Sequence, residues 1–218
     1  MKEQSKFVIK TAALIGFLAC LGDMSMTVIF GNRYPGYSQL HDTMSKLGAS
    51  DSPVGFQMSL WWVILCFLFI AFAFGFRQLY YKNGKWFRTA FWLIVIYALG
   101  EGMGSGIFPA NHDGNKLTLS LMIHDTLGGI GIGGIMVLPF ALMKTISEKK
   151  ANAFYRFSQI ILYAGPVFLI LFSIAKILTN PDNFIASYKG LWQRLLMLNY
   201  YVYLMVLAIR MWKESSKI

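Results

Sequence analysis

The sequence predicts an all-α, polytopic integral membrane protein with a bundle of six transmembrane helices. Of its 218 residues, 56% are hydrophobic and 14% are charged, a composition too apolar for a soluble domain. The apolar residues also run in six long stretches, each reaching the roughly 20 residues that a helix needs to cross a bilayer. A transmembrane barrel would instead alternate apolar and polar residues along its strands. These observations together favour a helical bundle.

The six predicted spans use nearly the whole chain, so we expect a single transmembrane domain over residues 1–218. The spans cover residues 7–30, 54–76, 89–108, 119–143, 157–178 and 193–212. The longest connection, residues 31–53, lies between the first two spans and carries Gly and Pro turn residues. Within it, the stretch 39–47 is suited to a short helix. A loop of this length can fold back over the mouth of the bundle.

Basic residues are distributed unevenly between the two ends of the predicted bundle. Six spans place both termini on one side, and fourteen of the 20 Lys and Arg residues lie on that side. By the positive-inside bias, the N and C termini are expected to be cytoplasmic, with segments 31–53, 109–118 and 179–192 facing outward. The formal net charge of +10 then reflects contacts with anionic headgroups. Membrane lipids are the expected partners; nothing indicates nucleic acid or a particular protein partner.

Several short motifs resemble a known family. These are Tyr34-Pro35-Gly36-Tyr37-Ser38, His41-Asp42-Thr43-Met44-Ser45-Lys46-Leu47-Gly48-Ala49, Pro53 at the second span, Gly106-Ile107-Phe108-Pro109 ending the third, and His124 early in the fourth. Together they resemble the bacterial six-helix membrane family catalogued as domain of unknown function 998. That resemblance implies a multi-pass protein of the bacterial cytoplasmic (inner) membrane. It supplies no set of catalytic residues.

A more distant resemblance concerns the loop that enters the second span. The arrangement of Met44 to Gly48, Pro53 and Phe56 is similar to the corresponding loop of the eukaryotic Frag and damage-regulated autophagy modulator family. Members of that family are similar six-span proteins implicated in lipid remodelling or lipid organisation. The resemblance therefore implies work linked to lipids.

Ionisable side chains inside the predicted spans indicate where a site lies. A charge at the centre of a membrane helix costs roughly 2.5–3.5 kcal/mol, and such groups usually face a cavity or a partner. Five of them lie near the outer ends of four spans: Asp23, Glu101, His124, Asp125 and Arg194. With a rise of 1.5 Å per residue, most of them lie in one layer about 7 to 11 Å below the outer interface. They can meet if their helix faces turn inward.

Three interpretations of this layer stay open. In a structural plug, Arg194 pairs with a carboxylate of the layer and fixes helix packing. In an intramembrane hydrolase or transferase, the candidate catalytic residues are Glu101, His124, Asp125 and Ser45, and the candidate ligand-binding residues are Asp23, His41, Asp42, His112, Asp113 and Arg194. In a small proton- or cation-coupled transporter, the acidic groups and the histidine form a relay.

Two of these interpretations have features against them. A divalent metal ion would suit the enzyme, but adjacent His124 and Asp125 point about 100° apart on a helix, and no His-x3-His pair exists. A relay lacks a carboxylate in the inner half, and Lys176 lies on another span, away from the layer. The sequence thus favours an outward-facing polar pocket that binds or processes a lipid or another amphiphilic molecule. A transporter is one alternative; a non-enzymatic membrane organiser or partner subunit is another.

Glycines spaced by four residues concentrate in the third and fourth spans. The pairs are Gly100 with Gly104, Gly102 with Gly106, and Gly129 with Gly133. Small residues at this spacing let two helix backbones approach closely. Spans three and four are therefore predicted to form a tight pair, which would bring Glu101 close to His124.

Overall fold

The computed structural model describes residues 2–113, 116–146, 153–178, 180 and 182–217. Within them, six helices are long and apolar enough to cross a membrane. The predicted fold class, an all-α bundle of six membrane spans, is confirmed. The long helices are α1 (Lys2–Gly31), α2 (Gly55–Tyr80), α5 (Leu119–Met143), α6 (Ala153–Ile177), α8 (Lys189–Ser215), and a composite third span of α3 (Lys85–Tyr97), η3 (Ala98–Gly104) and α4 (Ser105–Ile107).

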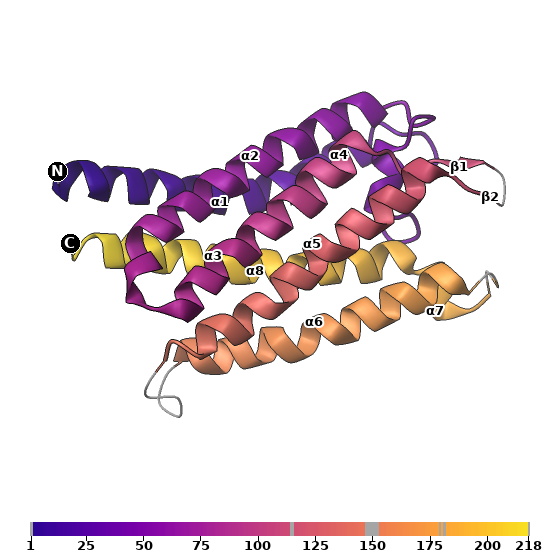
Figure 1. Ribbon diagram of the computed structural model, residues 1–218. Coiled ribbons are helices and arrows are strands. Elements are labelled where there is room, and N and C mark those ends of the chain that lie inside the picture. Colours follow the sequence, from indigo (N-terminus) through magenta and orange to yellow (C-terminus); the bar gives the residue numbers. More distant parts are fainter. Residues whose placement is uncertain (1, 114–115, 147–152, 179, 181, 218) are drawn as a thin grey trace.

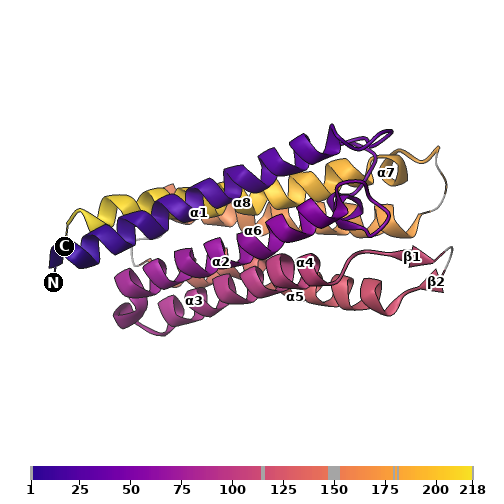
Figure 2. The same cartoon turned by 90° about the horizontal axis from the view of Figure 1, so that it is seen from above.

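The helices pack in chain order around the bundle. Each long helix contacts the next, and α8 returns to contact α1, so the bundle closes on itself (Figures 1 and 2). Both chain ends lie at one end of the bundle, which we call the terminal end. The opposite, loop end carries residues 31–53, the short helix α7 (Phe184–Ser187), and strands β1 (His112–Asp113) and β2 (Lys116–Leu117), which pair antiparallel. Which end faces the cytoplasm stays a prediction from the charge bias.

The third span changes its winding where its glycines cluster. Residues Ala98–Gly104 form a π-helical stretch within the span, and such stretches occur frequently at functional sites. Gly100 faces α5 so closely that an added Cβ would lie 2.7 Å from the Cα of Gly131. Gly102 faces α2, on the other side of the third span, where an added Cβ would lie 2.7 Å from the Cβ of Cys66. The glycines therefore let the third span approach α2 and α5 at once.

The third predicted glycine pair does not pack in this way. Nothing lies within 4 Å of a Cβ added to Gly129 or Gly133. The expectation of a close helix contact at this pair is wrong, because Gly128 and Gly131 occupy the face of α5 that meets the third span. Gly129 and Gly133 are rotated away from that face. They line a cleft described below.

We expect Gly100→Ala to destabilise the bundle, whereas Gly133→Ala does not. The added methyl at Gly100 meets backbone atoms of Gly131, which cannot move without shifting α5, and overpacking of this kind costs about 1–3 kcal/mol. At Gly133 the methyl enters open space, and alanine is the better helix former. Thermal unfolding in detergent checks both variants. Equal melting temperatures for the two would contradict the close approach of α5 and the third span.

Residues 31–53 fold back into the loop end of the bundle. Residues Met44–Gly48 form a 3₁₀ helix, η1, whose Leu47 is fully buried. The short helix expected over residues 39–47 therefore begins later than predicted and is tighter. Gly48 lies against the ring of Trp62, since an added Cβ there would clash with that ring. The element η1 contacts α1, α2, α4 and α8, so it covers the mouth of the bundle.

Candidate functional site

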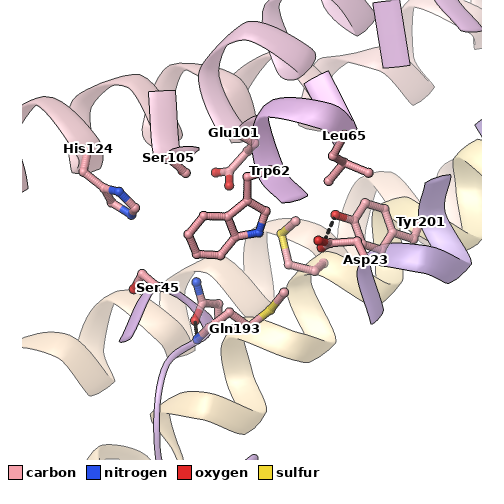
Figure 3. Close-up of a pocket in the computed structure, with 11 residues that line it drawn as sticks. Asp23, Ser45, Trp62, Leu65, Glu101, Ser105, His124, Gln193 and Tyr201 are labelled. Atoms are coloured by element: carbon pink, nitrogen blue, oxygen red, sulfur yellow. Dashed lines mark hydrogen bonds between the residues drawn. The ribbon is translucent and has the colours of Figure 1, made fainter. Parts of the chain in front are cut away.

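A small cavity lies directly below η1, at the depth of the predicted ionisable layer. Its volume is about 30 Å³, which holds two or three water-sized groups, since one water needs roughly 10–15 Å³ on this measure. We call it the polar cavity. Its lining residues are Asp23, Met44, Ser45, Trp62, Leu65, Glu101, Ser105, His124, Gln193, Met197 and Tyr201. In Figure 3, Glu101, Ser105 and His124 lie on one side, Ser45 and Gln193 on the other, and the Trp62 indole between them.

A larger cleft joins the polar cavity from the side. It has a volume of about 340 Å³ and lies between α5, α6 and α8; we call it the α5–α6 cleft. Six residues line both hollows: Ser45, Glu101, Ser105, His124, Gln193 and Met197. The remaining wall is mostly glycine and apolar side chains, such as Gly133, Leu169 and Phe172. Because Gly129 and Ser173 are exposed within their spans, the cleft opens sideways between α5 and α6.

Asp23 holds three helices together at the inner wall of the polar cavity. Its side chain is 1% exposed. The Trp61 indole N–H donates to Oδ1 at 3.0 Å, and the Tyr201 hydroxyl donates to Oδ2 at 2.7 Å. These donors come from α2 and α8, while Asp23 belongs to α1. A buried polar group needs such partners, so the satisfied carboxylate supports helix packing at the cavity wall.

Glu101 enters the polar cavity from the π-helical part of the third span. Its Oε1 lies 3.2 Å from the Cβ position of Gly128, and the hydroxyl oxygen of Ser105 lies 4.0 Å from the same point. Within the described residues, no group donates a hydrogen bond to Glu101, and the Ser105 hydroxyl, on a residue 5% exposed, has no partner. Both side chains line the cavity and the cleft. Two oxygen-bearing groups are thus available to a ligand.

His124 is 7% exposed and presents one ring nitrogen as an acceptor. Its Nδ1 lies 2.8 Å from the carbonyl oxygen of Phe108. Because a carbonyl can only accept, Nδ1 carries the hydrogen, and the neutral ring keeps a lone pair on Nε2. His124 precedes Gly128 by one helical turn and so lies on the same face of α5. The structure therefore brings Glu101 and His124 to one cavity, as the tight pairing of spans three and four requires.

Asp125 lies on the rim of the cleft and not in the polar cavity. Its carboxylate forms an ion pair with Lys176 of α6 at 2.9 Å, with side chains 44% and 42% exposed. The expectation that Lys176 lies away from the ionisable layer is therefore wrong. The adjacent positions of His124 and Asp125 explain the separation, because consecutive helical side chains point about 100° apart.

Arg194 does not pair with Asp23, Glu101 or Asp125, so that version of the structural plug is wrong. Its guanidinium donates instead to the folded-back loop: to Gln39 Oε1 at 2.6 and 3.0 Å, to the Tyr37 hydroxyl at 2.6 Å and to the Asp42 carbonyl at 3.0 Å. A fifth bond joins it to the Gly190 carbonyl of its own helix. Sequence spacing could not reveal these partners, because they depend on how residues 31–53 fold.

Among the loop residues, Ser45 reaches the polar cavity. Its hydroxyl donates to the Thr43 hydroxyl at 3.1 Å. Asp42 lies further out, where it pairs with Lys46 at 2.7 Å and accepts a bond from the Ser38 N–H at 2.9 Å. Partial burial alone would raise the pKa of Asp42, but the hydrogen bonds from Lys46 and Ser38 outweigh it and hold this pKa below its ordinary value. Asp42 therefore stabilises the loop.

Of the predicted histidines outside the spans, His41 does not line the polar cavity. His41 is exposed, and its Nδ1 lies 2.7 Å from the Ser187 carbonyl of α7. His112 and Asp113 have their backbone in β1, while their side chains lie outside the described part of the structure. Their expected ligand-binding role is left as a prediction.

Besides three apolar residues, the cavity is lined by four residues with uncharged polar groups that the sequence did not indicate as site residues: Trp62, Ser105, Gln193 and Tyr201. Ser105 follows Glu101 by four residues, a spacing that could have identified it. Gln193 precedes Arg194 and accepts a bond from the Met44 N–H at 2.7 Å, which holds η1 over the cavity. For the predicted divalent metal, the described residues contain no group of three or more His, Cys, Asp or Glu side chains that could hold an ion.

Comparison with known proteins places the chain in a family. The model of the family described as Protein of unknown function (DUF998) matches residues 17–210. The chain belongs to the DUF998 family. The match spans every residue that lines the polar cavity, from Asp23 to Tyr201. No curated protein and no solved structure matches the chain. This DUF998 member is a multi-pass membrane protein.

Proposed function

We propose that this DUF998 protein binds a lipid or another single-chain amphiphile, with the apolar chain in the α5–α6 cleft and the polar end in the polar cavity. One observation carries the proposal: a sideways-opening, largely apolar cleft leads directly to a cavity with unpaired polar groups. A membrane lipid reaches such an opening without leaving the bilayer. Ligand sites with apolar walls and a few convergent polar groups are typical of amphiphile binding.

The polar groups in the polar cavity are arranged for binding a ligand and not for nucleophilic catalysis. Nucleophilic catalysis uses a hydroxyl hydrogen-bonded to a base. In the described residues, the Ser45 hydroxyl donates to Thr43, and no hydroxyl is hydrogen-bonded to His124. The positions therefore support recognition of a polar group by Glu101, Ser105 and the free nitrogen of His124.

A transport function has less support from the arrangement of the hollows. A second hollow of about 370 Å³ lies toward the terminal end, lined by residues that include Tyr80, Arg210 and Glu214. It shares no lining residue with the polar cavity or the cleft. The fully buried side chains that line none of these hollows include Phe69, Phe72 and two tyrosines, Tyr97 and Tyr200, whose hydroxyls have no hydrogen-bond partner among the described residues. A relay would need polar groups linked to one another between the hollows.

We expect Gly133→Leu to remove bound lipid from the purified protein. The leucine side chain extends into the open space beside Gly133 and occupies the place of an acyl chain. A matched control is Ile130→Phe, which adds bulk at a 55% exposed position of the same helix that does not line the cleft.

Native mass spectrometry of protein released from mild detergent measures the retained lipid. The wild type and Ile130→Phe should carry lipid, and Gly133→Leu should lose occupancy about tenfold or more, equivalent to about 1.4 kcal/mol of binding free energy. Equal lipid retention in all three proteins would show that the cleft is not the binding site and would overturn the proposed function.

A further inference from the structure

The polar cavity contains the Glu101 carboxylate without a hydrogen-bond donor and, among the described residues, no cation in its lining. None of its lining residues is Lys or Arg. The nearest cation on the cleft, Lys176, is already paired with Asp125 on the rim. Asp23 receives two donors from the protein, whereas Glu101 and Ser105 receive none within the described residues. A phosphate or sulfate group brings only acceptors and negative charge, so this cavity disfavours it.

The unmet acceptors indicate which group belongs here. A carboxylate in a membrane span that lacks a donor is costly. The Ser105 hydroxyl, on a residue 5% exposed, likewise lacks a partner and lines the same cavity. With the lone pair on His124 Nε2, three acceptors from two helices face one small space. A group with three N–H donors and a positive charge satisfies all of them.

The size of the cavity restricts that group further. The polar cavity itself has a volume of about 30 Å³, room for two or three water-sized groups, and a larger polar end would have to stay in the cleft that Glu101, Ser105 and His124 also line. A primary ammonium is close to the size of water and carries three donors and no acceptor, whereas a trimethylammonium is several times larger and has no N–H. The Trp62 indole, 6% exposed, forms part of the wall and can stabilise a cation over its ring.

We infer that the polar cavity recognises the primary ammonium group of an amphiphile, held by Glu101, Ser105 and His124. The inference rests on the proposed function, because the α5–α6 cleft supplies the place for the apolar chain. The cleft alone accounts for an apolar chain, whereas the polar cavity determines the chemistry of the polar end. A long-chain primary amine, or a lipid whose polar end is a primary amine, has the required chemistry.

The test uses the full-length protein in nanodiscs of phosphatidylcholine, which has no primary amine. Binding of dodecylamine, dodecanol, dodecyltrimethylammonium and butylamine is measured against empty nanodiscs by calorimetry. The wild type should bind dodecylamine about tenfold more tightly than dodecanol or dodecyltrimethylammonium, because only the primary ammonium combines a positive charge with three N–H donors. Glu101→Gln, which keeps the side-chain shape but removes the negative charge, should abolish this preference for the amine.

Two further variants distinguish a specific loss of ammonium binding from a general folding defect. Asp182→Asn removes an exposed carboxylate that lines neither the polar cavity nor the cleft, so it should keep the amine preference. Ser105→Ala removes one acceptor and should weaken dodecylamine binding by a smaller factor than Glu101→Gln. Unchanged amine preference in Glu101→Gln, or equal binding of dodecyltrimethylammonium, would overturn the inference.

The outcomes separate this inference from the proposed function. If all the long-chain compounds bind equally and Gly133→Leu blocks them, amphiphile binding stands and ammonium recognition is wrong. If Gly133→Leu blocks none of them, the proposed function is wrong. If butylamine binds as tightly as dodecylamine, the ammonium site accepts a soluble amine, and the proposed amphiphile is overturned.

Discussion

Replacing Arg194 with lysine is expected to release residues 31–53 from the loop end of the bundle. The guanidinium donates five hydrogen bonds, four of them to Tyr37, Gln39 and Asp42 in that loop. A lysine ammonium presents a single nitrogen and cannot reproduce this planar arrangement. Loss of several charge-assisted bonds should cost about 3 kcal/mol locally, a factor of about 100 in the opening of the loop.

Hydrogen–deuterium exchange in nanodiscs measures this opening directly. The backbone N–H groups of Asp42, Met44 and Lys46 are hydrogen-bonded in the folded loop and should exchange about 100-fold faster in Arg194→Lys. Arg33→Lys is the matched control, since Arg33 lies in the same loop and is exposed, and among the described residues its side chain makes only a cation–π contact with Phe30, at 6.0 Å. Equal exchange in Arg194→Lys and the wild type would show that Arg194 does not hold the loop.

Replacing Asp23 with alanine should destabilise the whole bundle by about 3 kcal/mol. The change leaves the Trp61 indole N–H and the Tyr201 hydroxyl without their acceptor in the bundle interior, and each unsatisfied buried group costs about 1–3 kcal/mol. Asp23→Asn should cost about half as much, because its amide oxygen can accept from one donor while its NH₂ group faces the other.

Reversible unfolding in mixed detergent and SDS micelles gives the free energies of unfolding. In a double-mutant cycle, Asp23→Ala combined with Tyr201→Phe should cost less than the two single changes added together, because they share one hydrogen bond. Asp125→Asn serves as a control, since its ion pair with Lys176 is about 40% exposed on both sides and should contribute at most about 1 kcal/mol. A loss of unfolding free energy for Asp23→Ala as small as that for Asp125→Asn would show that Asp23 does not stabilise the contacts between α1, α2 and α8.

The fold and the depth of the site could be predicted because each depends on local sequence. Six apolar stretches of span length dictate six helices, since lipid offers backbone groups no other partner. Asp23, Glu101 and His124 could be assigned to one layer because rise per residue is nearly constant along a helix. All three line the polar cavity.

The pairing of charges could not be predicted in the same way. From their positions along their helices, Arg194 and Asp125 are expected near the depth of that layer. Arg194, however, is hydrogen-bonded to the loop, and Asp125 forms an ion pair with Lys176 of α6. The loop partners of Arg194 lie 152 to 157 residues away in the sequence, and Lys176 lies 51 residues from Asp125 on a different helix. Side-chain direction around each helix, together with the path of a long loop, decides such contacts.

By itself, the sequence determined a six-span membrane protein with an ionisable layer near one end of the bundle. Only the tertiary structure decided that the glycines of the third span contact two neighbours while Gly129 and Gly133 border an open cleft. It also decided that η1 covers the polar cavity and that Ser105 and Gln193 line it. The physical reason is that hydrophobicity and rise per residue set depth in the membrane, whereas a cavity depends on how helices rotate and pack against one another.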